Sequence, residues 1–490
     1  MNIRLFFLLF LGSTLLVSAD YYYDIPQQQE DFKVFRNVLE SKEGTLDLHL
    51  SSDSINLYLN KLGDDLSEEK TILEQFKLYS EMVVRLECGH TQVLADKTIL
   101  AEWLNEKKDL PIDMYFIGRR LISGKIIPDD YENIRRTNTP NQTTQIIPKN
   151  SEILSIDSLT VPEMMSEMGK YIPSDEGSVY FKYHQSSELF PFYHHLALPI
   201  TKDSVHVKYV TPKNDTNEVF LMPGKAPIHS MNARLLKSSQ RYSKNESDMG
   251  KFKIVNGNYG YFKFHSFSAS AGKDYNHFLK ESFRELKRKK IDKLVIDLRG
   301  NTGGVMQYDF IKYFTGEGAF VGKYVITKPF EKKENQYIRK VTVSFLRYAV
   351  LSHQQKKALR KGSFDEGKIY TEAVDKELIY DGEVSVITDE GTFSSASILA
   401  SQLKTLANAK IVGRPAGGSF YAGNAGTILL RLPQSKIQMS INPNTFYSHL
   451  DPQKDLNAIK QPDLYLDPNI VDEEERNQFY FKAAIGVFAN

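Results

Sequence analysis

The strongest constraint on the fold is a regular alternation of short apolar segments with amphipathic segments between residues 259 and 441. Four segments are predicted as strands: Tyr259–Phe267, Leu294–Leu298, Glu383–Ile387 and Lys410–Gly413. Two are predicted as helices: Tyr275–Lys289 and Ser395–Ala407. Two further strands, Ile428–Pro433 and Ile437–Ile441, are predicted to pair with each other. Strands that alternate with helices predict an α/β domain with parallel strands at its centre.

At 490 residues the chain is too long for one hydrophobic core, so two or three domains are expected. Residues 251–490 form the predicted α/β domain, and the polar residues 224–250 read as a linker. Apolar residues at three- and four-residue spacing predict an N-terminal helical cap region over residues 20–109.

Between the cap region and the linker, residues 110–223 contain short alternating strands and one short helix through Met164, Met165 and Met168. The order of strand, turn, strand and helix resembles a PDZ-like module, which binds peptide ends by adding a strand to a sheet edge. A plain α/β insert without a ligand fits the pattern equally well.

The first nineteen residues have the organisation of a secretory signal peptide. Arg4 supplies a positive start, an apolar run begins at Leu5, and small residues precede a cleavage site after Ala19. The apolar run is shorter than the roughly 20 residues of a membrane-spanning helix. We therefore expect a secreted or periplasmic protein without a membrane span.

Composition excludes several classes of function. The 62 basic and 61 acidic side chains nearly cancel, so no nucleic-acid partner is expected. Cys88 is the single cysteine, so the chain contains no intramolecular disulfide and no thiolate metal cluster. Export without disulfides favours a bacterial periplasm or surface. We predict no metal and no cofactor, and the oligomeric state stays open.

Ser394 follows a predicted buried strand and opens a predicted helix. A hydroxyl at such a turn lies at the edge of the sheet, close to free backbone N–H groups that stabilise negative charge. Serine is also a common helix cap, and position alone favours that interpretation.

A second turn follows the strand that ends at Leu298, where Gly300, Gly303 and Gly304 come close together. Glycines let a backbone approach a ligand and turn its N–H groups inward. A phosphate cradle is disfavoured because no Gly-Lys-Ser/Thr follows. Two interpretations of this turn stay open: an oxyanion hole and a purely structural turn.

Three motifs in order carry a resemblance to the tail-specific, or C-terminal processing, serine peptidases, which include the tricorn core. They are Asp297-Leu-Arg-Gly-Asn-Thr-Gly-Gly304, Gly391-Thr-Phe-Ser-Ser-Ala396 and Val412-Gly-Arg-Pro-Ala-Gly-Gly418. The resemblance implies a crotonase-like catalytic domain and a PDZ-like module, with Ser394 as nucleophile. It also implies an oxyanion hole made of the backbone N–H groups of Gly303, Gly304 and Ser395.

The expected base differs from that of the better-known branch of the family. Many members use a lysine 25 positions beyond the nucleophile, where this chain has Ser419. The other branch, like the tricorn core, carries a Gly-His-Thr/Ser element ahead of the PDZ-like region, and this chain has Gly89-His90-Thr91. The resemblance therefore implies His90 as the base, whose imidazole suits proton transfer near neutral pH.

A third group is expected to orient His90, either a hydroxyl beside it or a carboxylate late in the chain, after the last strand pair. Asp451 lies where the tricorn-like pattern places its acid, although an aspartate before Pro452 also fits a turn. Cys88 is set aside as a nucleophile because side chains so close in sequence rarely face one substrate together.

Two classes of function follow. The first is a serine peptidase acting on a peptide or protein substrate, with Ser394 and His90 as the reacting pair. The second is a non-catalytic binding protein on the same fold, because fold and function separate freely. A hydrolase of esters or lipids is a minor alternative.

Overall fold

The computed structural model describes residues 22–94, 99, 108–110, 112–126, 147–225, 250–267, 272–304, 307–316, 318–326, 337–342, 365–425, 427–451, 453 and 456–488. The predicted signal peptide lies outside the described residues, as does nearly all of the predicted linker.

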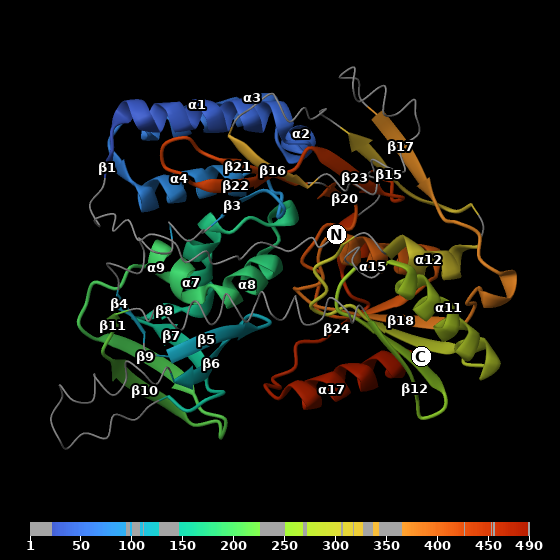
Figure 1. Ribbon diagram of the computed structural model, residues 1–490. Coiled ribbons are helices and arrows are strands. Elements are labelled where there is room, and N and C mark those ends of the chain that lie inside the picture. Colours follow the sequence, from blue (N-terminus) through green and yellow to red (C-terminus); the bar gives the residue numbers. More distant parts are fainter. Residues whose placement is uncertain are drawn as a thin grey trace.

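A six-stranded sheet forms the centre of the C-terminal half (Figure 1). Its order is β12-β13-β14-β18-β19-β24, and all neighbours are parallel except the antiparallel pair β12 and β13. The strands are β12 (Gly250–Val255), β13 (Tyr259–Phe264), β14 (Lys293–Asp297), β18 (Glu383–Thr388), β19 (Lys410–Gly413) and β24 (Leu464–Tyr465). The α/β prediction with parallel strands at its heart is confirmed.

Helices cover both faces of this sheet. Side chains alternate between the two faces along a strand, so one strand contributes residues to the core on each face. Leu294 and Ile296 of β14 belong to the core beneath α11 (Gly272–Arg288), α12 (Gln307–Thr315) and α15 (Ser395–Leu406). Val295, between them in sequence, packs on the opposite side against Tyr480 of α17 (Glu473–Gly486). Figure 1 shows α17 on the face opposite the other helices.

Two four-stranded sheets extend from this centre. One has the order β17-β15-β23-β20 and the other the order β16-β21-β22-β3. Their strands are β17 (Asp365–Tyr370), β15 (Phe320–Ile326), β23 (Asn444–Ser448), β20 (Ala422–Ala425), β16 (Ile338–Thr342), β21 (Thr427–Arg431), β22 (Gln438–Ile441) and β3 (Gln92–Leu94). The predicted pairing of the segments near 430 and 440 is confirmed by the antiparallel ladder of β21 and β22.

The N-terminal helices pack on the second of these sheets. They are α1 (Ile25–Lys42), α3 (Ser52–Asp65) and α4 (Ile72–Val84), and they share a core with Ile428, Leu430 and Met439. Thr71 begins α4 by a capping box with Glu74, which satisfies free N–H groups of the first turn. The helical region is thus joined to the C-terminal half through β3 and β22.

Residues 112–221 form a separate sheet of order β10-β9-β7-β6-β5, with β8 (Leu159–Thr160) beside β7. Its other strands are β5 (Ile112–Ile117), β6 (Arg120–Ile126), β7 (Glu152–Ile156), β9 (Val205–Val210) and β10 (Thr216–Leu221). Helices α7 (Val161–Met168), α8 (Val179–Glu188) and α9 (Phe190–Ala197) accompany it, and the three methionines predicted to be helical are buried in α7. Among the described residues, none of the helices has the length and apolar character of a membrane span.

Helix α8 connects this module to the central sheet. Phe181 of α8 stacks on Phe393, in the turn after β18, with ring centroids 3.9 Å apart. The N–H of Gly118 donates a hydrogen bond to Glu390 in the same turn, at 3.2 Å. The two parts of the chain therefore meet at the turn that carries Ser394.

Candidate active site

Ser394 lies at the turn between β18 and α15, where its backbone has φ +54° and ψ −127°. This conformation is strained for a residue with a side chain, by about 1–3 kcal/mol, and such strain is concentrated at functional sites. The Ser394 side chain makes no capping hydrogen bond to the helix. The helix-cap interpretation, which position alone favoured, therefore does not account for this serine.

Hydrogen bonds to two other segments hold the strained turn. The Phe393 N–H donates to the Asn301 carbonyl at 2.9 Å. The carbonyl of Thr392 accepts from the N–H groups of Gly417 and Gly418, at 2.9 and 3.2 Å. The three sequence motifs thus meet at one place, and these hydrogen bonds hold the turn in its strained conformation.

Gly303 packs directly against the serine. A Cβ atom at this position would lie 2.8 Å from the Ser394 Cβ and 2.9 Å from the Ser395 nitrogen. Only glycine allows this approach, and its φ of +97° also lies in the region that other residues avoid.

The three N–H groups expected to form the oxyanion hole differ in whether they already donate a hydrogen bond within the protein. The Gly303 N–H donates to Asn301 Oδ1 at 2.9 Å, so it is already engaged, contrary to the expectation from the sequence. For the N–H groups of Gly304 and Ser395, no acceptor occurs in the described part of the chain. Ser395 is also the first residue of α15, where the helix dipole favours negative charge.

His90 lies in the loop between α4 and β3, more than 300 residues from Ser394 in sequence, and the fold brings the two side chains together. The distance between His90 Nε2 and Ser394 Oγ is 3.0 Å, which is a hydrogen bond. The His90 ring also lies beside Phe393, with ring centroids 4.7 Å apart.

The position of His90 is set by its backbone. Ser440 of β22 donates its hydroxyl to the His90 carbonyl at 2.8 Å, and the Gly89 N–H donates to Asp175 Oδ1 at 2.8 Å. Burial lowers the pKa of His90 below its ordinary value, although the charges of Asp175 and Glu43 act in the opposite direction. The imidazole is therefore neutral, and able to accept a proton, at neutral pH.

The buried carboxylate of Glu43 stabilises the loop that carries His90 through hydrogen bonds. Glu43, at the end of α1, accepts hydrogen bonds from Thr91 and from Asn424 Nδ2 at 2.7 and 2.9 Å. The backbone N–H of Asn442 donates to it at 3.1 Å. Because Glu43 joins α1, the His90 loop, β20 and the turn after β22, the N-terminal region is part of the scaffold of the site.

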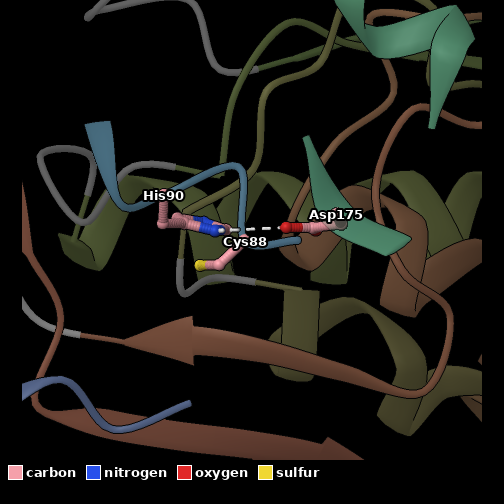
Figure 2. A group of neighbouring side chains, drawn as sticks. All are labelled: Cys88, His90 and Asp175. Carbon is pink, nitrogen blue, oxygen red and sulfur yellow. Dashed lines mark ion pairs between the residues drawn. The ribbon is translucent and has the colours of Figure 1, made fainter. Parts of the chain in front are cut away.

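Cys88, His90 and Asp175 form the group drawn in Figure 2, with one possible ligand atom from each residue, all within 4.8 Å of one another. A metal ion there would compete with existing contacts. The Asp175 carboxylate accepts from the N–H groups of Gly89 and Ser419. Burial raises the pKa of the Cys88 thiol well above its ordinary range, so it stays protonated and a poor nucleophile or ligand. The absence of a metal stays a prediction.

Asp451 does not take the place expected for it. It is exposed, and its Oδ1 accepts from the Gln453 N–H at 3.0 Å, as in a turn. Among the described residues, the carboxylate within 4.0 Å of a His90 ring nitrogen is that of Asp175. The structure therefore does not bring Asp451 to His90.

The lysine position of the better-known branch is also filled differently. The Ser419 hydroxyl donates to Glu176 and accepts from the N–H of Tyr421 at 3.1 Å. Lys404, the nearest lysine after Ser394 in sequence, donates to the carbonyl of Gln461 at 2.9 Å. Neither side chain is arranged to take a proton from Ser394.

Asp175 and Phe181 are the site residues that the sequence did not indicate. Both come from residues 175–181, in the helical part of the module at 112–221, and no local motif marks them. Only the packing of that module against the turn after β18 brings them to His90 and Phe393.

Comparison with known proteins is consistent with this geometry. Residues 258–439 match the model of peptidase family S41. The chain is similar to the carboxy-terminal processing protease CtpB of Bacillus subtilis (strain 168), with 28% identity over 220 residues. This match covers 44% of the chain and 36% of CtpB, so the chain spans about a third of the length of that relative.

Solved structures extend the likeness in fold to nearly the whole chain. Mature CPAF complexed with lactacystin matches with a TM-score of 0.60 and 12% identity, over 94% of this chain and 97% of that one. Mature CPAF alone matches with a TM-score of 0.55 and 12% identity, over 90% and 93%. At this identity the likeness shows the fold alone. Residues 258–439 thus match peptidase family S41, in agreement with the resemblance that the three sequence motifs carry.

Proposed function

We propose that this protein is a serine peptidase in which Ser394 is the nucleophile and His90 the base. The observation that carries the proposal is the 3.0 Å contact between His90 Nε2 and Ser394 Oγ, within the range for direct proton transfer. The strained backbone of Ser394 supports it, because a capping serine does not need that conformation.

The reaction is an acyl transfer in two halves. Ser394 Oγ bonds to the carbonyl carbon of the substrate while its proton passes to His90 Nε2, and the carbonyl oxygen becomes an oxyanion. The C–N bond then breaks, and His90 returns the proton to the leaving amine. Water, deprotonated by His90, attacks the acyl-enzyme in the same way and releases the carboxylic acid.

The oxyanion requires donors that the folded chain has not already used. The N–H groups of Ser395 and Gly304 fit this role, whereas the N–H of Gly303 is engaged by Asn301. Gly303 instead supplies the space that lets the nucleophile turn lie against the glycine turn. Removal of one such donor in other serine peptidases costs on the order of 10²–10³-fold in rate.

The proposal also includes the domain types and the export that the sequence analysis predicts. We infer that the catalytic domain is crotonase-like and that the module at 112–221 is PDZ-like, the kind of module that binds peptide ends by strand addition. The protein is exported, with cleavage after Ala19. The match to peptidase family S41 supports a peptide or protein substrate.

The experiment is covalent labelling with a fluorophosphonate probe, which reacts with activated serines, followed by digestion of a peptide library. We expect the unmodified protein to be labelled, Ser394→Ala to lose labelling completely and His90→Ala to lose it by on the order of 10³-fold or more. Ser401→Ala is the matched control. Ser401 lies on the same helix, and its hydroxyl donates to the carbonyl of Ile398 away from His90.

The outcomes separate the alternatives. A folded, unlabelled protein that still binds peptides would favour the non-catalytic binding protein. Labelling that persists in Ser394→Ala would place the nucleophile elsewhere. Labelling with cleavage of simple esters and no peptide in the library would favour an esterase.

A further inference from the structure

We propose that Asp175 is the positioning residue for His90: its carboxylate fixes the ring so that Nε2 faces Ser394 and Nδ1 carries the proton. This inference rests on the serine peptidase proposed above and names the third group of its site. It replaces Asp451, which the sequence indicated and which lies in a turn of its own.

The geometry begins with the unpaired nitrogen of His90. Nδ1 is buried and has no hydrogen-bond partner among the described residues, while Nε2 is paired with Ser394. Asp175 Oδ1 lies 4.0 Å from Nδ1, and the dashed line in Figure 2 marks this pair. A movement of about 1 Å closes this gap to a hydrogen bond, and catalytic contacts commonly tighten when substrate binds.

The chemistry requires an acceptor at this place. For Nε2 to accept the Ser394 proton, the neutral ring must carry its own proton on Nδ1. A buried N–H without an acceptor costs about 1–3 kcal/mol, and the imidazolium formed in the reaction needs a nearby negative charge. Asp175 meets both needs with one carboxylate.

The other groups around His90 are less suited. Glu43 is the second acidic group that acts on the ring, but its oxygens accept from Thr45, Thr91, Asn424 and Asn442. The Cys88 thiol is held protonated by burial and carries no charge. Asp175 remains as the nearby carboxylate that faces Nδ1.

Two backbone N–H groups hold the Asp175 carboxylate, one on each of its oxygens. Its Oδ1 accepts from the Gly89 N–H at 2.8 Å, one residue before the base. Its Oδ2 accepts from the Ser419 N–H at 3.2 Å, in the third family motif. Because Asp175 comes from the module at 112–221, the site has its full set of groups only when that module is docked.

Asp175→Asn tests the role, since it keeps the shape of the side chain and removes the charge. We expect kcat to fall by on the order of 10²–10⁴-fold with KM nearly unchanged. The pKa of His90 loses a contribution that raises it, so the acid limb of the kcat/KM profile moves to lower pH. Asp175→Glu, which restores the charge, should return the limb toward its original position.

Glu176→Gln is the matched control. It removes one charge from the neighbouring residue, whose partners are Ser419 and Lys460 and not His90. We expect its acid limb to stay in place and its kcat to change by no more than about twofold, as for a partly exposed ion pair. Thermal unfolding of all variants identifies any that are misfolded.

A second measurement needs no variant at position 175. In protein labelled with ¹⁵N-histidine, and assigned with His90→Gln, we expect the neutral His90 ring to carry its proton on Nδ1. A proton on Nε2 would overturn the inference, as would an Asp175→Asn variant that matches Glu176→Gln in both kcat and acid limb. If the unmodified protein itself neither hydrolyses peptides nor reacts with the probe, the proposed function fails instead.

Discussion

A methyl group added at Gly303 provides a sharp test of the site, because this glycine lies against the nucleophile and not merely near it. In Gly303→Ala the new Cβ would lie 2.8 Å from the Ser394 Cβ and 2.9 Å from the Phe393 carbonyl oxygen. Carbon atoms in contact prefer about 3.5–4.0 Å, so the Ser394 side chain must move by about 1 Å. A displacement of this size costs on the order of 10²-fold in rate.

Gly300→Ala separates this effect from backbone strain. Gly300 has φ +68°, so alanine is strained there too, by about 1–2 kcal/mol, but its Cβ would meet nothing within 4 Å. We expect both variants to lose stability through backbone strain, and Gly303→Ala to lose more because its Cβ also meets Ser394 and Phe393. Only Gly303→Ala should lose probe labelling and peptide hydrolysis.

The assay is the rate of fluorophosphonate labelling, measured together with chemical unfolding. Labelling of Gly303→Ala as fast as that of the unmodified protein would refute the reasoning, since the 2.8 Å contact would then not control the position of the nucleophile. Equal loss in both would attribute the effect to strain in the glycine turn and not to the contact with Ser394.

Three further predictions concern the pH dependence of activity, the pH dependence of stability and a buried ion pair. Because burial lowers the pKa of His90 below 6.5, the acid limb of kcat/KM should have its midpoint below pH 6.5, and a midpoint above it would contradict the assignment of His90 as the base. Because the folded pKa of His90 lies below 6.5, the unfolded chain binds this proton more tightly than the folded chain. The free energy of unfolding should therefore decrease as the pH falls from 6.5 through the folded pKa of His90. His90→Gln should abolish this part of the pH dependence. Arg414 donates to both oxygens of buried Glu390, at 2.6 and 3.0 Å, so Arg414→Met should leave an uncompensated charge and lower the unfolding free energy by about 3–5 kcal/mol. A loss under about 1 kcal/mol would show that this pair is not a structural requirement of the turn after β18.

Much of the central domain was predictable because its signals are local. Periodicity placed the strand at Leu294 and the helix after Ser394, where apolar residues repeat at the spacing of one element. The nucleophile, the glycine turn and the base were named from short motifs, each of which lies within about ten residues of sequence.

The errors arose where the direction of a side chain decides which hydrogen bond forms, even between residues two positions apart. Asp451 has the right residue type after the last strand pair, but its carboxylate turns back to the Gln453 N–H. Gly303 was expected to offer its N–H, which Asn301 takes two residues earlier. Both outcomes depend on side-chain directions, which spacing alone does not specify.

By itself, the sequence determined the order of strands and helices, the family motifs and the serine that carries the strongest case as nucleophile, because these depend on neighbouring residues. The tertiary structure decided the environment of that serine. It brought His90 within 3.0 Å across 304 positions, excluded a capping role for the Ser394 hydroxyl and supplied Asp175 from another module. Packing against distant segments sets hydrogen-bond distances and burial, and those quantities distinguish a reactive hydroxyl from an ordinary one.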